Sequence, residues 1–173
     1  MLTDDQFNEM FLEATDMLYS LGLRLFRNQP EEANDFVQDV YLRARKKYSL
    51  FQGKSKFSTW LYRLALNHGL NTLNKKKKVL LSEKEELSQA GELVFSTEEE
   101  SALDRIIDKE VSEKIRAELD ELPEAYRLCL VLYYFEKMTY VDIAEKLSLK
   151  EGTVKSHIHR GKKLLRDSLK GIR

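Results

Sequence analysis

The 173-residue chain has one cysteine, Cys129, so no disulfide can form within it. A lone thiol is typical of a reducing compartment. No stretch approaches the roughly 18 unbroken apolar residues of a membrane span, and the first ten residues, MLTDDQFNEM, are acidic, whereas a signal peptide begins with basic residues. We therefore expect a soluble, cytoplasmic protein without a membrane span.

The sequence also lacks the residue groups that carry out chemistry. It shows no nucleophile paired with a base and no metal-ligand cluster. His157 and His159 stand two residues apart, so on a helix they point roughly 200° apart and cannot grip one ion. Cys129 lies in the apolar run LCLVLYYF and is interpreted as a core residue. We expect no enzyme activity, no metal and no cofactor.

The net charge is zero, but the charges are segregated. Residues 1–74 carry 9 basic and 9 acidic side chains, and four lysines follow at 75–78. Residues 79–121 carry 5 basic against 14 acidic side chains, whereas residues 122–173 carry 11 basic against 6 acidic. Two basic regions flanking an acidic middle indicate contact with nucleic acid at both ends.

The apolar spacing predicts helices throughout and no strand. In the first half we expect three helices. One starts at a capping box of Thr3 and Gln6 and continues to the break at Asn28–Pro30. The second buries residues between Ala33 and Tyr48, and the third spans Ser58–Asn74 and ends in the four lysines. The buried positions expected in the second are Ala33, Phe36, Val37, Val40, Tyr41, Ala44 and Tyr48.

The second half is expected to form a separate small helical domain. Residues 79–101 are rich in Glu and Ser and are interpreted as an acidic linker. A helical pattern resumes near Ala102, and Pro123 opens a helix through Tyr134. We thus expect an all-α protein of two domains, residues 1–78 and 102–173.

Two tightly joined helices at the C-terminal end are typical of a helix-turn-helix. Thr139 caps the first with Asp142 as its partner, and Ser148 with Glu151 predicts a second capping box. The second helix, about Leu149–Leu169, has an apolar stripe (Val154, Ile158, Gly161, Leu165 and Leu169). Its opposite face is expected to contact DNA through Lys155, Ser156, His159, Arg160 and Lys163, with Arg166 further round. The alternative is a merely solvated basic helix.

The helix Ser58–Asn74 carries a second polar stripe. Trp60, Arg63, Asn67, Asn71 and Asn74 recur at spacings of 3, 4, 4 and 3. Asparagine amides can bond base edges, an aromatic ring can stack on a base, and the lysines from Lys75 onward can hold phosphates. The alternative is a polar edge beside the core.

These segments resemble a known family. Asp35–Ala44 (DFVQDVYLRA), FQG at 51–53 and Phe57–Asn67 (FSTWLYRLALN) resemble region 2 of bacterial sigma factors. LPEAYR from Leu122, TYVDIAEKL from Thr139 and EGTVKSHIHRGK from Glu151 resemble region 4. Two such regions with a short linker are similar to the extracytoplasmic-function (ECF) group of sigma-70 factors.

The resemblance implies a promoter-recognition subunit of RNA polymerase. The polymerase clamp coiled coil would bind Asp35, Gln38 and Asp39, and the polymerase flap is a further implied contact. These three residues surround Leu42 on the polar face of their helix, and an exposed leucine among hydrogen-bonding groups suits a contact between helices. The near-promoter element would be bound and opened by the loop 50–57 and by Phe57, Trp60, Arg63, Asn67, Asn71, Asn74 and Lys75. The upstream element would meet the C-terminal helix, and an anti-sigma factor is an implied partner. The acidic linker is implied to thread the polymerase's nucleic-acid channels. The alternative function is a stand-alone helix-turn-helix regulator of transcription.

Overall fold

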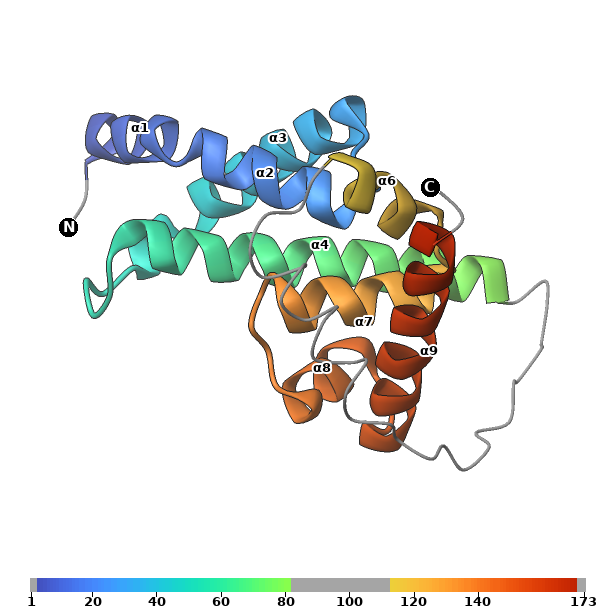
Figure 1. Ribbon diagram of the computed structural model, residues 1–173. Coiled ribbons are helices and arrows are strands. Elements are labelled where there is room, and N and C mark those ends of the chain that lie inside the picture. Colours follow the sequence, from blue (N-terminus) through green and yellow to red (C-terminus); the bar gives the residue numbers. More distant parts are fainter. Residues whose placement is uncertain (1–2, 82–112, 171–173) are drawn as a thin grey trace. The chain divides into compact units, whose positions relative to one another are not determined.

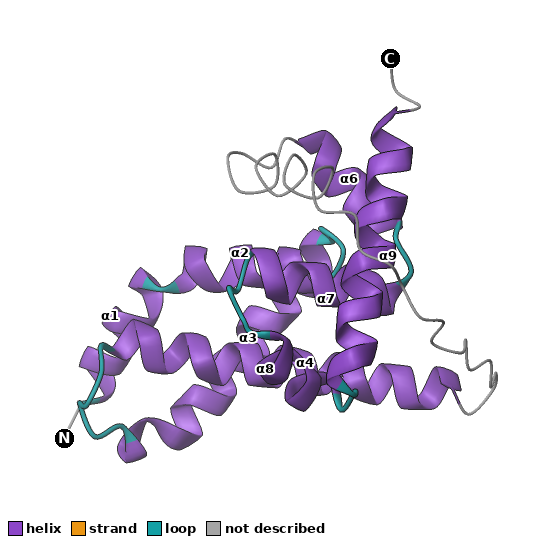
Figure 2. Cartoon of the chain, turned by 60° about the horizontal axis from the view of Figure 1, so that its bottom comes forward, coloured by secondary structure: helices purple, strands orange, loops and turns teal. Residues whose placement is uncertain are grey.

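The computed structural model describes residues 3–81 and 113–170, and side chains within 3–75 and 113–169. These residues form helices and no strand, as the all-α prediction requires (Figures 1 and 2). The chain divides into two compact units, 1–85 and 86–173. The predicted linker at 79–101 and the predicted helical start at 102–112 lie almost entirely outside the described residues. No described helix combines the length and apolarity needed to cross a bilayer.

Unit 1 is a bundle of α1 (Asp4–Glu13), α2 (Thr15–Leu25), α3 (Pro30–Lys47) and α4 (Phe57–Leu81), with a short 3₁₀ turn, η1 (Tyr48–Leu50), after α3. In Figure 1, α4 is the long green helix, and α1, α2 and α3 all contact it. Apolar side chains from every α-helix meet in one core. The core consists of Phe7, Phe11, Ala14, Leu18, Leu21, Leu25, Phe26, Ala33, Phe36, Val40, Ala44, Phe57, Leu61, Ala65 and Leu70.

The first predicted helix is two helices, because the chain tightens at Ala14. The Ala14 N–H donates to the Phe11 carbonyl at 3.0 Å, three residues back, and the Thr15 hydroxyl donates to the same carbonyl at 3.2 Å. The Phe11 carbonyl thus accepts these two hydrogen bonds, and the regular i to i−4 pattern of the helix is interrupted. Helix α2 therefore begins anew, with Ala14 as its N-cap. The capping box of Thr3 and Gln6 is confirmed, as is Pro30 in the first turn of α3.

Two other details of the first half differ from the sequence prediction. Helix α4 runs to Leu81, so the lysines at 75–78 lie within it instead of after it. Lysine is a good helix former and nothing in that stretch breaks the hydrogen-bond pattern. On α3, Val37, Tyr41 and Tyr48 are half-buried, since they flank the fully buried line of Ala33, Phe36, Val40 and Ala44.

Unit 2 contains α6 (Glu113–Glu121), α7 (Glu124–Tyr134), α8 (Tyr140–Leu147) and α9 (Glu151–Lys170), and α9 contacts the other three. Arg127 is fully buried on α7, where its guanidinium donates twice to the Glu124 carboxylate at 3.0 and 3.1 Å. Gly161 lets α9 approach α7, because a Cβ there would lie 2.9 Å from Leu130 Cδ1. The unit thus has a tight core under α9.

The turn between α8 and α9 differs from the predicted second capping box. Ser148 ends α8 with φ 54° and ψ 44°, a left-handed conformation, and its N–H donates back into α8. Helix α9 begins at Glu151, and the Lys150 carbonyl accepts from Thr153 and Val154. Ser148 therefore closes one helix instead of opening the next. The capping box of Thr139 and Asp142 at the start of α8 is confirmed.

Candidate nucleic-acid interface

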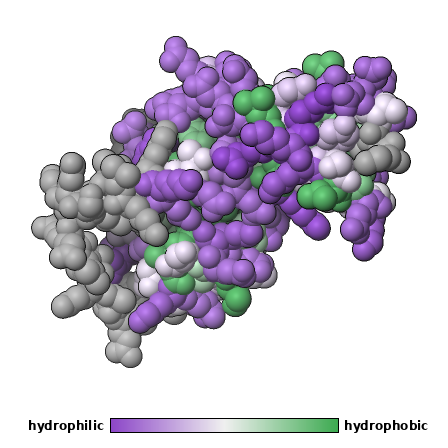
Figure 3. Space-filling view, turned by 180° about the vertical axis from the view of Figure 1, so that it is seen from behind, coloured by the Kyte–Doolittle hydropathy of each residue, from purple (hydrophilic) through white to green (hydrophobic). Residues whose placement is uncertain are grey.

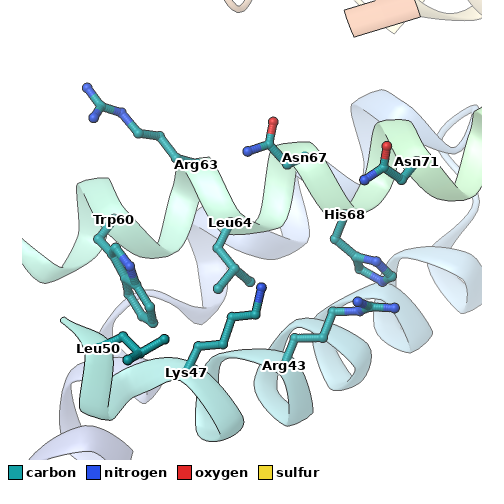
Figure 4. A pocket seen from close by; sticks show the side chains of 9 residues that line it. All are labelled: Arg43, Lys47, Leu50, Trp60, Arg63, Leu64, Asn67, His68 and Asn71. Carbon is teal, nitrogen blue, oxygen red and sulfur yellow. The ribbon is translucent and has the colours of Figure 1, made fainter.

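A hollow of about 360 Å³ lies between α3 and α4 in unit 1 (Figure 4). Helix α4 supplies six of its side chains and α3 supplies two cations, while Leu50 comes from η1. Figure 4 shows Trp60, Leu64 and His68 pointing toward α3, whereas Arg63, Asn67 and Asn71 point away from it along the rim. The lining residues are Arg43, Lys47, Leu50, Trp60, Arg63, Leu64, Asn67, His68 and Asn71.

The predicted stripe on α4 therefore borders this hollow. Trp60, Arg63, Asn67 and Asn71 line it together, while the half-buried Asn74 and the exposed Lys75 continue the same helix beyond it. The sequence interpretation missed the α3 side. The i, i+4 spacing of Arg43 and Lys47 on a predicted helix was the available signal, since it places both cations on one face.

Aromatic packing fixes the position of Trp60. Its ring lies 5.6 Å from Phe51 and 5.5 Å from Phe57, centroid to centroid. Phe57 is only 4% exposed and meets Phe7 edge-on at 5.8 Å. Phe57 thus lies in the core and supports the indole, while Trp60 stays half-exposed. A ring held in this way is suited to stacking, because little side-chain freedom remains to be lost.

His68 links the hollow to the outer face of α3. Its ring stacks on Phe36 with centroids 6.0 Å apart, and Nε2 lies 3.4 Å from an Asp39 carboxylate oxygen. Burial lowers the pKa of His68 from its ordinary value, and the positive charge of Arg43 lowers it further. The hydrogen bond to Asp39 raises the pKa and so opposes this shift, whereas the positive charge of Lys75 lowers the pKa further. The imidazole is therefore held toward its neutral form.

The acidic patch predicted on α3 is exposed. We define it as Asp35, Gln38, Asp39 and Leu42, all of which face solvent, with Leu42 57% exposed. An exposed leucine among acceptor groups is typical of a protein–protein contact surface. On the face drawn in Figure 3, apolar side chains form only small separate patches among hydrophilic ones.

The outward face of α9 has the predicted arrangement. Val154, Ile158, Gly161 and Leu165 are buried, whereas Lys155 and Lys163 are exposed and Ser156, His159 and Arg160 are partly exposed. Lys155 lies 2.8 Å from Glu151 and stands 5.7 Å from the centre of the Tyr140 ring. Lys155 is thus held by contacts with Tyr140 of α8 and with Glu151 in the first turn of α9.

His157 lies on the inner side of α9, unlike His159. Its ring meets Tyr126 at 5.1 Å and its Nδ1 lies 3.9 Å from the sulfur of the buried Cys129. Among the described residues no group of three or more His, Cys, Asp or Glu side chains could hold a metal ion. Neither unit's described part offers a cofactor site built from such ligands.

Both halves of the chain match family models. Residues 10–79 match Sigma-70 region 2, and residues 112–165 match Sigma-70, region 4. The chain is 33% identical over 160 residues to the ECF RNA polymerase sigma factor SigW of Bacillus subtilis, covering 91% of this chain and 85% of that protein. It is 30% identical to the ECF RNA polymerase sigma factor SigE of Mycolicibacterium smegmatis, covering 94% of this chain and 61% of that protein.

A solved structure shares the fold. The sigma factor RpoE of Bartonella quintana, crystallised with the anti-sigma factor NepR, matches with a TM-score of 0.55 at 22% identity. The match covers 96% of this chain and 98% of that one. This match shows that the two chains share a fold.

Proposed function

The chain belongs to the ECF group of the sigma-70 family and is an alternative sigma factor, and we propose how its residues divide the work of transcription initiation. In this proposal unit 1 binds core RNA polymerase and opens the near-promoter element, and unit 2 binds the upstream element. The domain division proposed is residues 1–78, an acidic linker at 79–101, and residues 102–173.

The observation that carries the proposal is the hollow beside Trp60. It combines a half-exposed indole with the exposed amides of Asn67 and Asn71 on one helix. A stacking ring and amide groups together suit an unstacked base, and capture of such a base offsets the cost of opening the duplex. Arg63, Asn74 and Lys75 extend this surface along α4, and Phe57 supports it from the core.

The polymerase contact is assigned to the acidic patch. Asp35, Gln38 and Asp39 offer acceptors around the exposed Leu42 on one face of α3. That arrangement fits a helical partner with basic side chains, as the polymerase clamp coiled coil would present. A second polymerase contact, with the flap, is proposed for unit 2.

The upstream element is assigned to α9. A helix of this kind enters the major groove with its N-terminal part toward base edges. Ser156, His159 and Arg160 are proposed to contact bases, whereas Lys155 and Lys163 are proposed to contact phosphates. Together with unit 1 this gives two separate attachments to promoter DNA.

The proposal extends to location and regulation. Members of this family are non-enzymatic initiation factors, and we propose that this chain acts without catalytic activity or cofactor, on polymerase in the cytoplasm. The solved relative was crystallised with an anti-sigma factor. We propose an anti-sigma partner for this chain as well.

The testing experiment is run-off transcription with core polymerase on a fragmented genomic library. Transcripts that start at a common promoter motif, and that require this chain, are the expected result. Failure of the chain to direct any transcript, combined with failure to associate with core polymerase in a pull-down, would overturn the proposal. That outcome would favour the stand-alone regulator, which needs DNA contact but no polymerase.

A further inference from the structure

We propose that Arg43 and Lys47 of α3 form a phosphate-binding wall that holds the backbone of the opened DNA strand while its bases face α4. This inference rests on the proposed function of unit 1 and adds a ligand group to it. The ligand is a nucleotide of single-stranded DNA, with its phosphate against α3 and its base toward Trp60.

The two sides of the hollow differ in chemistry. The α3 side offers only the guanidinium of Arg43 and the ammonium of Lys47 (Figure 4). They stand four residues apart on one helix face, which places their Cβ atoms about 5–6 Å apart. Cations so placed can hold one phosphate between them or two successive ones. They offer no hydrogen-bond acceptor, so they cannot read the mixed donor and acceptor pattern of a base edge.

The α4 side offers what the α3 side lacks, and its own cation, Arg63, points away from α3 (Figure 4). Trp60 presents an indole, and Asn67 and Asn71 present amides that both donate and accept. Leu64 lies between the two helices and gives the hollow an apolar floor. A nucleotide has the same division, with an anionic phosphate at one end and a flat base at the other. The chemistry of the hollow therefore orients the strand across it.

The cations of α3 are available for a ligand. Neither Arg43 nor Lys47 has a carboxylate within 4.0 Å among the described residues, and both side chains are exposed. No acidic side chain lines the hollow, and the nearby Asp39 carboxylate contacts His68. The positive charge of Arg43 also contributes to lowering the pKa of His68. An anion entering the hollow thus meets positive charge without an internal competitor.

The test neutralises phosphates one at a time. Holoenzyme is assembled from core polymerase and the full chain, and it binds a fork-junction probe carrying a promoter found by run-off transcription. Each linkage of the unpaired non-template strand is replaced in turn by an uncharged methylphosphonate. We expect one or two adjacent replacements to weaken binding about three- to fivefold, the upper part of the range of an exposed ion pair.

Variants then identify the protein partner. Arg43→Gln and Lys47→Gln should lose about the same affinity for the unmodified probe, and should lose nothing more when the sensitive linkage is neutralised. Lys46→Gln is the matched control, because Lys46 is an exposed neighbour that does not line the hollow. It should retain the sensitivity of the wild-type chain.

Three results would overturn the inference. The first is wild-type affinity in both variants, and the second is unchanged sensitivity to every linkage in both. The third is that binding of the wild-type holoenzyme weakens by the same amount whichever linkage is replaced. This third result is obtained with the wild-type chain alone, so it does not depend on whether the variants fold. In each case the wild-type chain still directs transcription, so the outcome differs from failure of the proposed function, in which no transcript forms at all.

Discussion

The Nε2 atom of His68 lies 3.4 Å from a carboxylate oxygen of Asp39. This contact joins α4, which borders the candidate DNA-binding hollow, to α3, which carries the acidic patch proposed to bind polymerase. The Asp39 carboxylate thus belongs to the acidic patch and contacts His68, which lines the hollow. A substitution at Asp39 is expected to alter the hollow as well as polymerase binding.

The titration of His68 can be measured directly. Burial and Arg43 lower its pKa below the ordinary 6.5, so the folded chain binds this proton more weakly than the unfolded chain. Stability contributed by the neutral imidazole is therefore fully present above pH 6.5 and is lost as pH falls below that value. Proton NMR of the ring should give a midpoint below 6.5, with His68→Gln identifying the signal among three histidines.

Asp39→Asn provides the companion measurement for His68. Loss of the carboxylate removes the hydrogen bond and charge that raise the pKa, so the midpoint should fall further. A midpoint that rises in Asp39→Asn, or one at or above 6.5 in the wild-type chain, would contradict the described environment.

Substitutions of Trp60 and Asn67 should separate DNA opening from polymerase binding. Trp60→Ala and Asn67→Ala remove the stacking ring and one amide, so initiation on duplex promoters should fall by at least about fivefold, given stacking worth about 1–3 kcal/mol. Association with core polymerase should be unchanged. Templates with a pre-opened bubble should restore much of the activity. Thr59→Ala, an exposed change on the same helix, is the control. Undiminished initiation in both variants would show that the α4 stripe is not the opening surface.

The two kinds of contact proposed for α9 predict different defects. Lys163→Ala should weaken binding to all promoters similarly and reduce the dependence of log affinity on log salt by about 0.9. Arg160→Ala should instead relax preference at one base pair, with a loss of about 1–3 kcal/mol at the preferred sequence. Holoenzyme binding to a randomised upstream element measures both. A uniform loss in Arg160→Ala would reassign that residue to the backbone.

Polymerase binding should depend on the sign of charge at Asp39. Asp39→Arg places a cation where a basic partner is expected, so affinity for core polymerase should fall by at least about tenfold. Glu9→Arg makes the same reversal at an exposed position on α1 and should leave affinity near wild type. Surface plasmon resonance with immobilised core measures both variants. Equal affinity of Asp39→Arg and wild type would remove the acidic patch from the polymerase interface.

Substitution by alanine should destabilise the protein at one glycine of α9 and not at another. A Cβ at Gly161 would lie 2.9 Å from Leu130 Cδ1 and 3.2 Å from Tyr126 Cβ, and Leu130 is buried. Gly161→Ala should cost about 1–3 kcal/mol of unfolding free energy. At Gly152 nothing lies within 4 Å of the added atom, so Gly152→Ala should be neutral or stabilise by up to about 1 kcal/mol. Urea denaturation compares them, and destabilisation of equal size in both would contradict the packing described for Gly161.

Helix positions were predictable where one face of a helix is apolar. The spacing of Val154, Ile158 and Leu165 identified the inner face of α9, and the capping boxes at Thr3 and Thr139 were visible as side-chain pairs. The break at Ala14 was not predictable from that spacing, because Ala14 keeps the apolar rhythm across α1 and α2. The turn at Ser148 was misread because serine followed by glutamate resembles a capping box, whereas the left-handed conformation is decided by how α8 ends.

The candidate hollow was half predictable. The α4 side could be found from one sequence stripe, since the spacing of Trp60, Asn67 and Asn71 reveals a shared helix face. For the α3 side the spacing of Arg43 and Lys47 reveals only that the two cations share a face of their helix, because their approach to that stripe depends on how α3 packs against α4. Phe57 was expected to contact DNA but lies in the core. Its position in the sequence does not distinguish a buried ring from an exposed one.

Trp60 is the chain's only tryptophan, and it stands half-exposed at the edge of the hollow beside Phe51 and Phe57. Its fluorescence is consequently an intrinsic optical signal that comes from one place in the molecule. Emission excited at the red edge of indole absorption would report the occupancy of the hollow without a dye or a label.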